Sequence, residues 1–355
     1  MMRFSPLELD EWVHRWRGVG TNLDISGMSH PGQDLLPDVE EGQSPLDLEE
    51  RLVELISTRY GVEEERIALT FGAQNANFLT LITQLSHLDK VAVETPIYEP
   101  MRVVAKSICD VVDVPRTREH AFVPEMDLLD EILSAGARML MLTNLHNPTA
   151  AVLKDEELSA MADIAEDRGT MVLCDEIYRE MCYSDPPLPF HAFPEVGITT
   201  NGVTKLYGLG ELRVGWLIGP PEVAREVQRA RMAMASNLPS HSLAVTIAAL
   251  ERRDLFRERM LSHAKENLEI LRQWSTKESR ANLVWPKGAL MFSLKLPKGI
   301  DDLEFSEMML ERYDTAVCPG RFFGSYGQVR VTFSCPSSEF GRGLENISSG
   351  LDHLS

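Results

Sequence analysis

Long apolar stretches are absent from this sequence of 355 residues. No stretch approaches the ~18 apolar residues that would suggest a membrane span. The segment from Met1 to Pro6 also lacks the apolar core of a secretory signal. We therefore expect neither membrane insertion nor secretion. Hydrophobic residues still make up 44% of the chain, which is ordinary for a folded globular protein.

Cysteine is scarce, and its pattern excludes two common uses. None of the five cysteines forms a CxxC pair, and an odd number cannot pair completely within one chain. Their spacing matches no zinc site, so we expect no metal. Reduced thiols are typical of the cytoplasm, which is the location we predict. The residues are Cys109, Cys174, Cys182, Cys318 and Cys335.

Positive charge is also in short supply. The chain has 35 Lys and Arg residues against 54 Asp and Glu residues, and its net charge is −19. A nucleic-acid-binding protein needs a basic surface to meet phosphates, so this class is disfavoured, as is a regulatory protein fused to a DNA-binding domain. We expect a soluble surface on which any anion site is a local exception.

The sequence does contain a repeated alternation of short apolar segments with helical patterns. Continuous apolar strands between helices predict an α/β fold with a mostly parallel sheet covered on both faces. Two of the predicted helices are 98–107 and 155–168. The predicted strands are 66–70, 90–94, 111–114, 138–143, 170–174, 197–201 and 214–218.

The length of the chain predicts a large domain and a smaller one. We assign residues 41–240 to the large domain, and residues 241–355 together with the N-terminal segment 1–40 to a smaller α+β domain. Residues 7–16 have the pattern of a short amphipathic helix. The C-terminal part contains a long helical region from about 240 to 274, followed by strands at 283–285, 290–296 and 329–334.

Two candidate ligand-binding turns follow predicted strands. In Thr70-Phe71-Gly72-Ala73-Gln74-Asn75-Ala76-Asn77, a glycine leads into a helix whose unpaired N–H groups suit a phosphate. In Asn144-Leu145-His146-Asn147-Pro148-Thr149, the proline holds Asn147 extended at the edge where open α/β sheets bind ligands. Taken alone, each motif is better explained as an ordinary turn or cap.

Two further motifs place charged groups beside apolar strands. Asp175 directly follows the strand 170–174, where burial is costly unless a cation meets the carboxylate, and Tyr178 can reach the same ligand. A helix-capping role for Asp175 explains the sequence equally well. Lys205 lies between a strand and a glycine-rich loop, where burial favours the neutral, nucleophilic amine. Arg213 follows with a permanent charge for a phosphate, although a lone lysine is usually a solvated surface residue.

Together these motifs resemble the class I and II aminotransferases, which are fold-type I enzymes that use pyridoxal 5'-phosphate (PLP). The order and spacing agree over nearly the whole chain: Asp175 lies 28 residues after Asn147, Lys205 lies 30 residues after Asp175, and Arg213 lies 8 residues after Lys205. The C-terminal part agrees as well. Its matching motifs are Pro286-Lys287-Gly288-Ala289, Pro319-Gly320-Arg321-Phe322-Phe323-Gly324 and Val329-Arg330-Val331.

The resemblance implies a role for each matching residue. Lys205 holds PLP as a Schiff base and moves the substrate proton, and Asp175 pairs with the ring nitrogen. Tyr178 and Asn147 bond the ring oxygen, and Tyr98 stacks on the ring. The remaining residues bind the phosphate (Gly72, Ala73, Gln74 and Arg213) or the amino acid (Arg330 at its α-carboxylate, with Gly27 and Asn147 beside it).

The resemblance also implies a function: transfer of an amino group between an amino acid and a 2-keto acid, by a homodimer. β-Elimination at a C–S bond, or decarboxylation, stays open as an alternative on the same fold. Two departures concern the phosphate site. Gly202 stands where the family usually has a serine, a loss for which Thr200 or Thr204 would have to compensate, and the segment 35–42 lacks the family's tyrosine.

Overall fold

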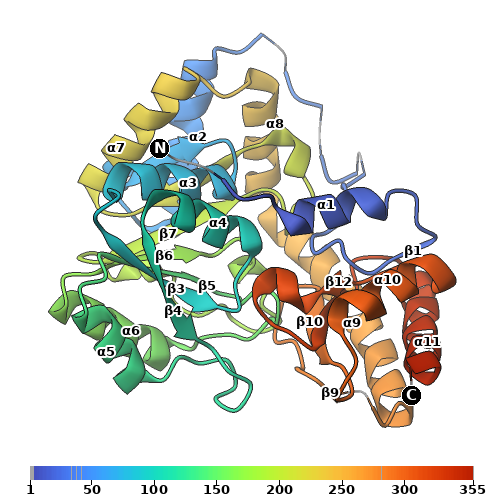
Figure 1. Cartoon of the computed structure of the whole chain (residues 1–355). Helices are drawn as coiled ribbons and strands as arrows, with labels where there is room; N and C mark the ends of the chain where they lie inside the picture. The colour runs from blue at the N-terminus through green and yellow to red at the C-terminus, as the bar shows by residue number, and fades with distance from the viewer. Residues whose placement is uncertain (1–3, 33, 37, 41, 281, 355) are drawn as a thin grey trace.

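The computed structural model describes residues 4–32, 34–36, 38–40, 42–280 and 282–354. Its main feature is a seven-stranded sheet flanked by helices, beside which lies a four-stranded antiparallel sheet with its own helices (Figure 1). The prediction of an α/β fold with a smaller α+β part built from both termini is confirmed. The division at residues 40/41 and 240/241 stays a prediction, and residue 41 itself lies outside the described residues.

The large sheet has the strand order β2-β8-β7-β6-β5-β3-β4. Strand β8 runs antiparallel to both of its neighbours, and the remaining pairs are parallel. Since β2 and β7 are each antiparallel to β8, they point in the same direction. The strands are β2 (Ile67–Thr70), β3 (Lys90–Thr95), β4 (Asp110–Pro115), β5 (Met139–Thr143), β6 (Met171–Asp175), β7 (Gly197–Gly202) and β8 (Gly215–Ile218).

Both faces of the inner part of this sheet are buried, which explains why β5 and β6 are almost continuously apolar. Side chains alternate along a strand, so Val91 and Val93 of β3 join one hydrophobic cluster while Ala92 joins another. The first cluster lies under α3 (Ala73–Gln84), α4 (Glu99–Ile108) and α7 (Pro221–Met234). The second lies under α5 (Met126–Ser134) and α6 (Asp155–Asp167). Each fully buried aliphatic side chain contributes about 1.5–3 kcal/mol to the free energy that holds these layers together.

The four-stranded sheet has the order β12-β13-β10-β9. Its strands are β9 (Asn282–Leu283), β10 (Met291–Lys295), β12 (Cys318–Pro319) and β13 (Gln328–Thr332). Helices α10 (Asp302–Tyr313) and α11 (Ser337–Leu354) lie beside it in Figure 1. The region predicted as one long helical stretch consists of α8 (Ser240–Glu251) and α9 (Arg253–Lys277), separated at Arg252, and α8 packs on α2 (Pro45–Tyr60).

The N-terminal segment runs toward the C-terminal part of the chain (Figure 1). Helix α1 (Glu8–Arg15) confirms the predicted amphipathic helix, and its Leu9 and Trp12 pack against Phe322 and Phe323. Strand β1 (Thr21–Asn22) then pairs in parallel with β11 (Thr315–Ala316). These contacts fix the residues that follow β1 close to β13.

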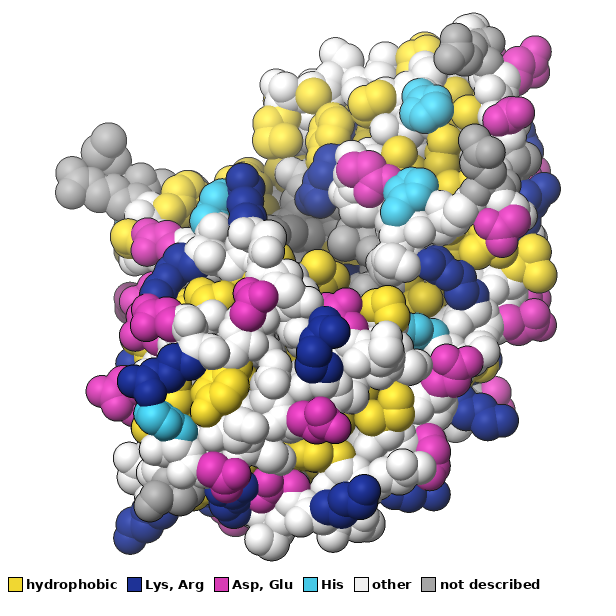
Figure 2. Space-filling model, turned by 90° about the vertical axis from the view of Figure 1, so that its right-hand side faces the viewer, with side chains coloured by type: hydrophobic (Ala, Val, Ile, Leu, Met, Phe, Trp, Pro, Cys, Tyr) yellow, Lys and Arg dark blue, Asp and Glu magenta, His cyan; other side chains and the backbone are white. Residues whose placement is uncertain are grey.

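Charges of both signs are mixed on the surface. On the face shown in Figure 2, Lys and Arg side chains are scattered among Asp and Glu side chains. Among the described residues, no helix has the length and apolar character needed to cross a bilayer.

Candidate functional site

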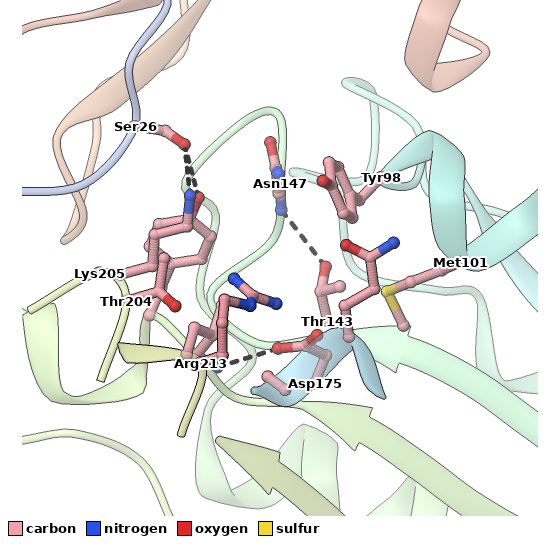
Figure 3. A pocket seen from close by; sticks show the side chains of 13 residues that line it. Ser26, Tyr98, Met101, Thr143, Asn147, Asp175, Thr204, Lys205 and Arg213 are labelled. Carbon is pink, nitrogen blue, oxygen red and sulfur yellow. Dashed lines mark hydrogen bonds between the residues drawn. The ribbon is translucent and has the colours of Figure 1, made fainter. Parts of the chain in front are cut away.

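A cavity lies where the parallel strands of the large sheet end, the edge at which open α/β sheets bind ligands. Residues that follow β3, β5, β6 and β7 meet there, so motifs far apart in the sequence share one site (Figure 3). Most of the residues singled out from the sequence line it: Ala73, Gln74, Tyr98, Asn147, Asp175, Tyr178, Lys205 and Arg213. The other lining residues are Ser26, Met101, Thr143, Ile177 and Thr204.

Lys205 lies three residues after β7 ends at Gly202, and its backbone is held in place from the N-terminal segment. Its carbonyl accepts a hydrogen bond from Met28 N at 2.8 Å. Its Nζ donates to Ser26 Oγ at 3.1 Å and lies 5.5 Å from the centre of the Tyr178 ring. The backbone of Gly27 comes so close that a Cβ there would lie 3.2 Å from Lys205 Cδ. A larger residue at position 27 would therefore crowd the lysine and the Thr204 carbonyl oxygen.

Asp175 is the last residue of β6, and its carboxylate is buried at the lower end of the cavity in Figure 3. Asn77 Nδ2 donates to one oxygen at 2.7 Å, and the backbone N–H of Ile177 donates to the other at 3.0 Å. Burial raises the pKa of Asp175, although these hydrogen bonds and the charge of Lys205 act in the opposite direction. A cation in the cavity would therefore stabilise the charged carboxylate.

The turn at Gly72 that leads into α3 has the geometry expected of a phosphate-binding turn. Gly72 adopts φ +90°, a conformation that favours glycine, and α3 begins at Ala73. A Cβ on Gly72 would lie 3.0 Å from Arg213 Nη2, so the guanidinium lies directly against this turn. Arg213 also donates to the carbonyl oxygens of Gly210 and Phe71, at 3.2 and 3.3 Å.

The structure explains why glycine stands at position 202. Gly202 pairs with Gly215 across β7 and β8, and a Cβ on Gly202 would lie 2.9 Å from the Val214 carbonyl oxygen. The close approach of the two strands therefore leaves little room for a serine. Of the two threonines considered as replacements, Thr204 lines the cavity, whereas Thr200 Oγ1 is buried and donates to Asn77 Oδ1 at 2.6 Å.

Asn147 is positioned by a buried polar network beneath the cavity. Its backbone N–H donates to Thr143 Oγ1 at 3.3 Å, and Thr143 in turn donates to Glu94 at 2.6 Å. Glu94 forms a fully buried ion pair with Arg116. Breaking such a pair by removing one partner is strongly destabilising, so this network fixes the end of β5.

His146 ties the Asn147 loop to the loop that carries Tyr98. Burial lowers the pKa of His146 far below its usual value, so the ring is neutral. Its Nε2 lies 2.8 Å from the carbonyl oxygen of Pro96, which can only accept, so Nε2 carries the hydrogen and Nδ1 accepts from Thr149 Oγ1. Burial also raises the pKa of Tyr98 to about 12, which keeps this phenol neutral over the cavity.

Arg330 does not line the cavity itself, but its guanidinium contacts Asn147, which does. Its Nη1 donates to Asn147 Oδ1 at 3.3 Å, and its Nη2 donates to the carbonyl oxygen of Asp24 at 3.0 Å and forms a buried ion pair with the Asp24 carboxylate. The second carboxylate oxygen of Asp24 accepts from Trp16 Nε1 at 2.9 Å. The buried Nε of Arg330 has no hydrogen-bond partner among the described residues. The guanidinium therefore retains a free donor although Asp24 already neutralises it.

Asn77, Asp24 and Ser26 are among the polar residues of the site that were not anticipated from the sequence. Asn77 lies four residues after Ala73, hence on the same face of α3, and helical periodicity would have found it. Asp24 interrupts an apolar segment just as Arg330 interrupts another, and two buried charges of opposite sign suggest a pair. Ser26 carries no such signal, because it reaches the cavity only through the path of the N-terminal segment.

Comparisons with known proteins agree with this geometry. The family model "Aminotransferase class I and II" matches residues 41–347. An aspartate aminotransferase of Pyrococcus horikoshii is 28% identical over 318 residues, covering 86% of this chain and 81% of that protein. Capreomycidine synthase of Streptomyces vinaceus is 27% identical over 289 residues, covering 80% of this chain and 74% of that protein. The crystal structure of a PLP-dependent aminotransferase from Streptococcus suis superposes with a TM-score of 0.88 at 24% identity, covering 100% of this chain and 99% of that one.

Proposed function

This chain belongs to the family of class I and II aminotransferases, and from that premise we propose how its own residues carry out the family's reaction. The protein is a PLP-dependent transferase that moves an amino group between an amino acid and a 2-keto acid. The aspartate aminotransferase among its relatives supports transfer, and no feature of the site favours C–S elimination or decarboxylation. The observation that carries the residue assignments is the meeting of Lys205 and the buried Asp175 in one cavity.

The residues present fit PLP. Asp175 is a buried carboxylate whose charge is incompletely compensated, so it suits a protonated ring nitrogen. Tyr98 supplies an aromatic side chain beside the same cavity. The backbone amides of Gly72, Ala73 and Gln74 with the guanidinium of Arg213 suit the phosphate, because a helix N-terminus and a fixed cation both favour an anion. Thr204 supplies a hydroxyl near this end, where the chain has Gly202 in place of serine.

In the reaction, PLP supplies an electron-accepting ring that weakens the bonds to the substrate's α-carbon. The protein residues bind and orient the reactants and move the proton. Lys205 would hold the cofactor covalently and, as a free amine, would act as general base for the substrate α-proton. Asp175 keeps the ring nitrogen protonated, while Tyr178 and Asn147 bond the ring oxygen. Asn77 and the Ile177 N–H hold the Asp175 carboxylate in place.

The substrate carboxylate is assigned to Arg330, with Gly27 and Asn147 beside it. The free Nε–H of Arg330 supports this assignment, because an unpaired buried donor gains a partner when a carboxylate binds. The substrate carboxylate would share the Arg330 guanidinium with the Asp24 side chain, which already forms an ion pair with it. Asp24 therefore orients Arg330 and also lowers the net charge that the substrate meets.

Arg330→Gln is expected to raise the KM for the amino acid roughly 10- to 100-fold, through loss of a charge-assisted hydrogen bond. The Kd for PLP should change less than about threefold, because Arg330 does not line the cavity at the phosphate or ring-nitrogen end. Since the single variant leaves Asp24 buried without its cation, an Asp24→Asn/Arg330→Gln double variant serves as the control for stability. Equal losses of amino-acid and PLP affinity would contradict the assignment.

The proposed reaction is tested by loading the protein with PLP and adding a mixture of amino acids without any keto acid. A transaminase forms about one keto acid per active site and then stops, and adding a 2-keto acid restarts it. The amounts of keto acid and ammonia are followed over time. Continuous release of keto acid with ammonia would instead indicate elimination, and release of carbon dioxide would indicate decarboxylation.

We further propose that the protein works in the cytoplasm as a homodimer with its active site at the subunit interface. The large apolar side chains Met232 and Met234, at the end of α7, are 54% and 56% exposed, and a second subunit would cover such a surface. All five cysteines are free thiols, which fits a reducing compartment.

A further inference from the structure

The hydroxyl of Ser26 joins two residues of the proposed catalytic machinery. Lys205 Nζ donates to Ser26 Oγ at 3.1 Å, and Ser26 Oγ lies 2.8 Å from the Tyr178 hydroxyl. Both dashed contacts converge on Ser26 above Lys205 in Figure 3. Ser26 is only 7% exposed, so water has little access to this junction.

The position of Ser26 does not depend on its own side chain. The segment from Leu23 to Met28 is held by backbone hydrogen bonds at both ends: Leu23 N to the carbonyl of Ala316 at 2.9 Å, and Met28 N to the carbonyl of Lys205 at 2.8 Å. The carbonyl of Leu23 also accepts from Thr332 N at 2.8 Å. Removing the Ser26 hydroxyl should therefore leave the backbone path unchanged.

The chemistry of the three groups limits the direction of the hydrogen bonds. A protonated lysine amine can only donate, so Ser26 Oγ accepts from Lys205 and its own hydrogen is available for the Tyr178 oxygen. When Ser26 donates to Tyr178, the hydrogen of Tyr178 points away from Ser26. Successive hydrogen bonds polarise one another, so donation from Ser26 makes Tyr178 a stronger donor in turn. When the lysine amine is neutral it can accept, and the Ser26 hydrogen can turn back toward it.

We propose that Ser26 is a positioning residue that holds the amine of Lys205 whenever this lysine is released and directs the Tyr178 hydrogen toward the ring oxygen of PLP. The inference rests on the proposed function, in which Lys205 moves the substrate proton and Tyr178 bonds that oxygen. One hydroxyl therefore serves the general base and the ring at the same time. This role falls to the N-terminal segment, outside the motifs that carry the other roles.

The test is the pH midpoint of the visible absorbance of the PLP-loaded enzyme. Hydrogen-bond donation to the ring oxygen favours its proton-poor form, so weaker donation by Tyr178 moves the midpoint to higher pH. Ser26→Ala is expected to raise it by about half a unit to one unit. The kcat should fall about 3- to 10-fold, with little change in the KM for the amino acid. The other charged groups near the site, Asp175, Arg213 and the Asp24–Arg330 pair, are unchanged in this variant.

Two matched variants separate the hydroxyl from the volume of the side chain. Ser26→Thr keeps the hydroxyl and is expected to restore the wild-type midpoint. In a Tyr178→Phe background, Ser26→Ala is expected to cause no further shift of the midpoint, because the hydrogen bond from Tyr178 to the ring oxygen is already absent. An additive shift in that background, or a Ser26→Thr variant that behaves like Ser26→Ala, would overturn the inference.

Failure of the Ser26 inference and failure of the proposed function give different absorbance spectra in the wild type and in Lys205→Ala. A visible band whose pH midpoint is unchanged in Lys205→Ala would overturn the proposed function and this inference with it. A Lys205-dependent band whose midpoint is the same in Ser26→Ala and the wild type would overturn this inference alone.

Discussion

Replacing Lys205 with alanine is expected to lower amino-group transfer by about 10⁴-fold or more, because the variant loses its covalent attachment to PLP and its general base together. Among the described residues the side chain makes one hydrogen bond, to Ser26, so its removal should cost little stability. The measurements are the rate of keto acid formation, and the visible absorbance that remains with the protein after gel filtration. The rate should fall to background, and any PLP that stays bound without the Schiff base should lose the pH-dependent absorbance of the wild type.

A matched control uses a lysine on the surface. Lys265, on α9, is exposed and far along the chain from the proposed site, so Lys265→Ala should keep the rate and the absorbance of the wild type. Thermal unfolding of both variants checks that the fold is intact. Wild-type turnover by Lys205→Ala would show that another residue holds the cofactor.

The large sheet was predictable because its signal is local. A strand buried on both faces needs apolar residues throughout, and each strand of this kind was visible between helical patterns. The antiparallel direction of β8 was not predictable, because it depends on how the chain returns to the sheet after the Lys205 loop. The break between α8 and α9 was also missed, since Arg252 is neither glycine nor proline. Nothing local there ends a helix, and Arg252 donates instead to the carbonyl of Leu35.

The site was predictable to the extent that its residues follow strands of one sheet. The carboxyl ends of parallel strands meet at one edge, so Asn147, Asp175 and Lys205 had to lie near one another. Contacts made by the N-terminal segment could not be inferred in this way. The segment reaches the cavity by pairing β1 with β11, a contact between residues nearly 300 positions apart. For this reason Ser26 was missed, as was the pairing of Asp24 with Arg330.

Asp175→Asn is expected to lower kcat roughly 10²- to 10³-fold, because it removes the charge that would keep the ring nitrogen protonated. The substitution keeps the size of the side chain but not its acceptors. Both carboxylate oxygens now accept N–H groups, from Asn77 and from Ile177, and the amide NH₂ of asparagine would face one of these donors. The variant should therefore also be less stable by about 1–3 kcal/mol, which thermal or denaturant unfolding would measure.

Thr200→Val tests whether the effect of Asp175→Asn comes from the lost charge or from the disturbed hydrogen-bond network. Valine matches the shape of threonine and removes only the hydrogen bond from Thr200 Oγ1 to Asn77 Oδ1, leaving the carboxylate itself intact. Its loss of kcat should stay below about tenfold, the effect of one neutral hydrogen bond. If Asp175→Asn and Thr200→Val lowered kcat equally, the effect would lie in the packing of the network. A much larger loss in Asp175→Asn means that the negative charge faces a cation during the reaction, as expected if Asp175 pairs with the ring nitrogen.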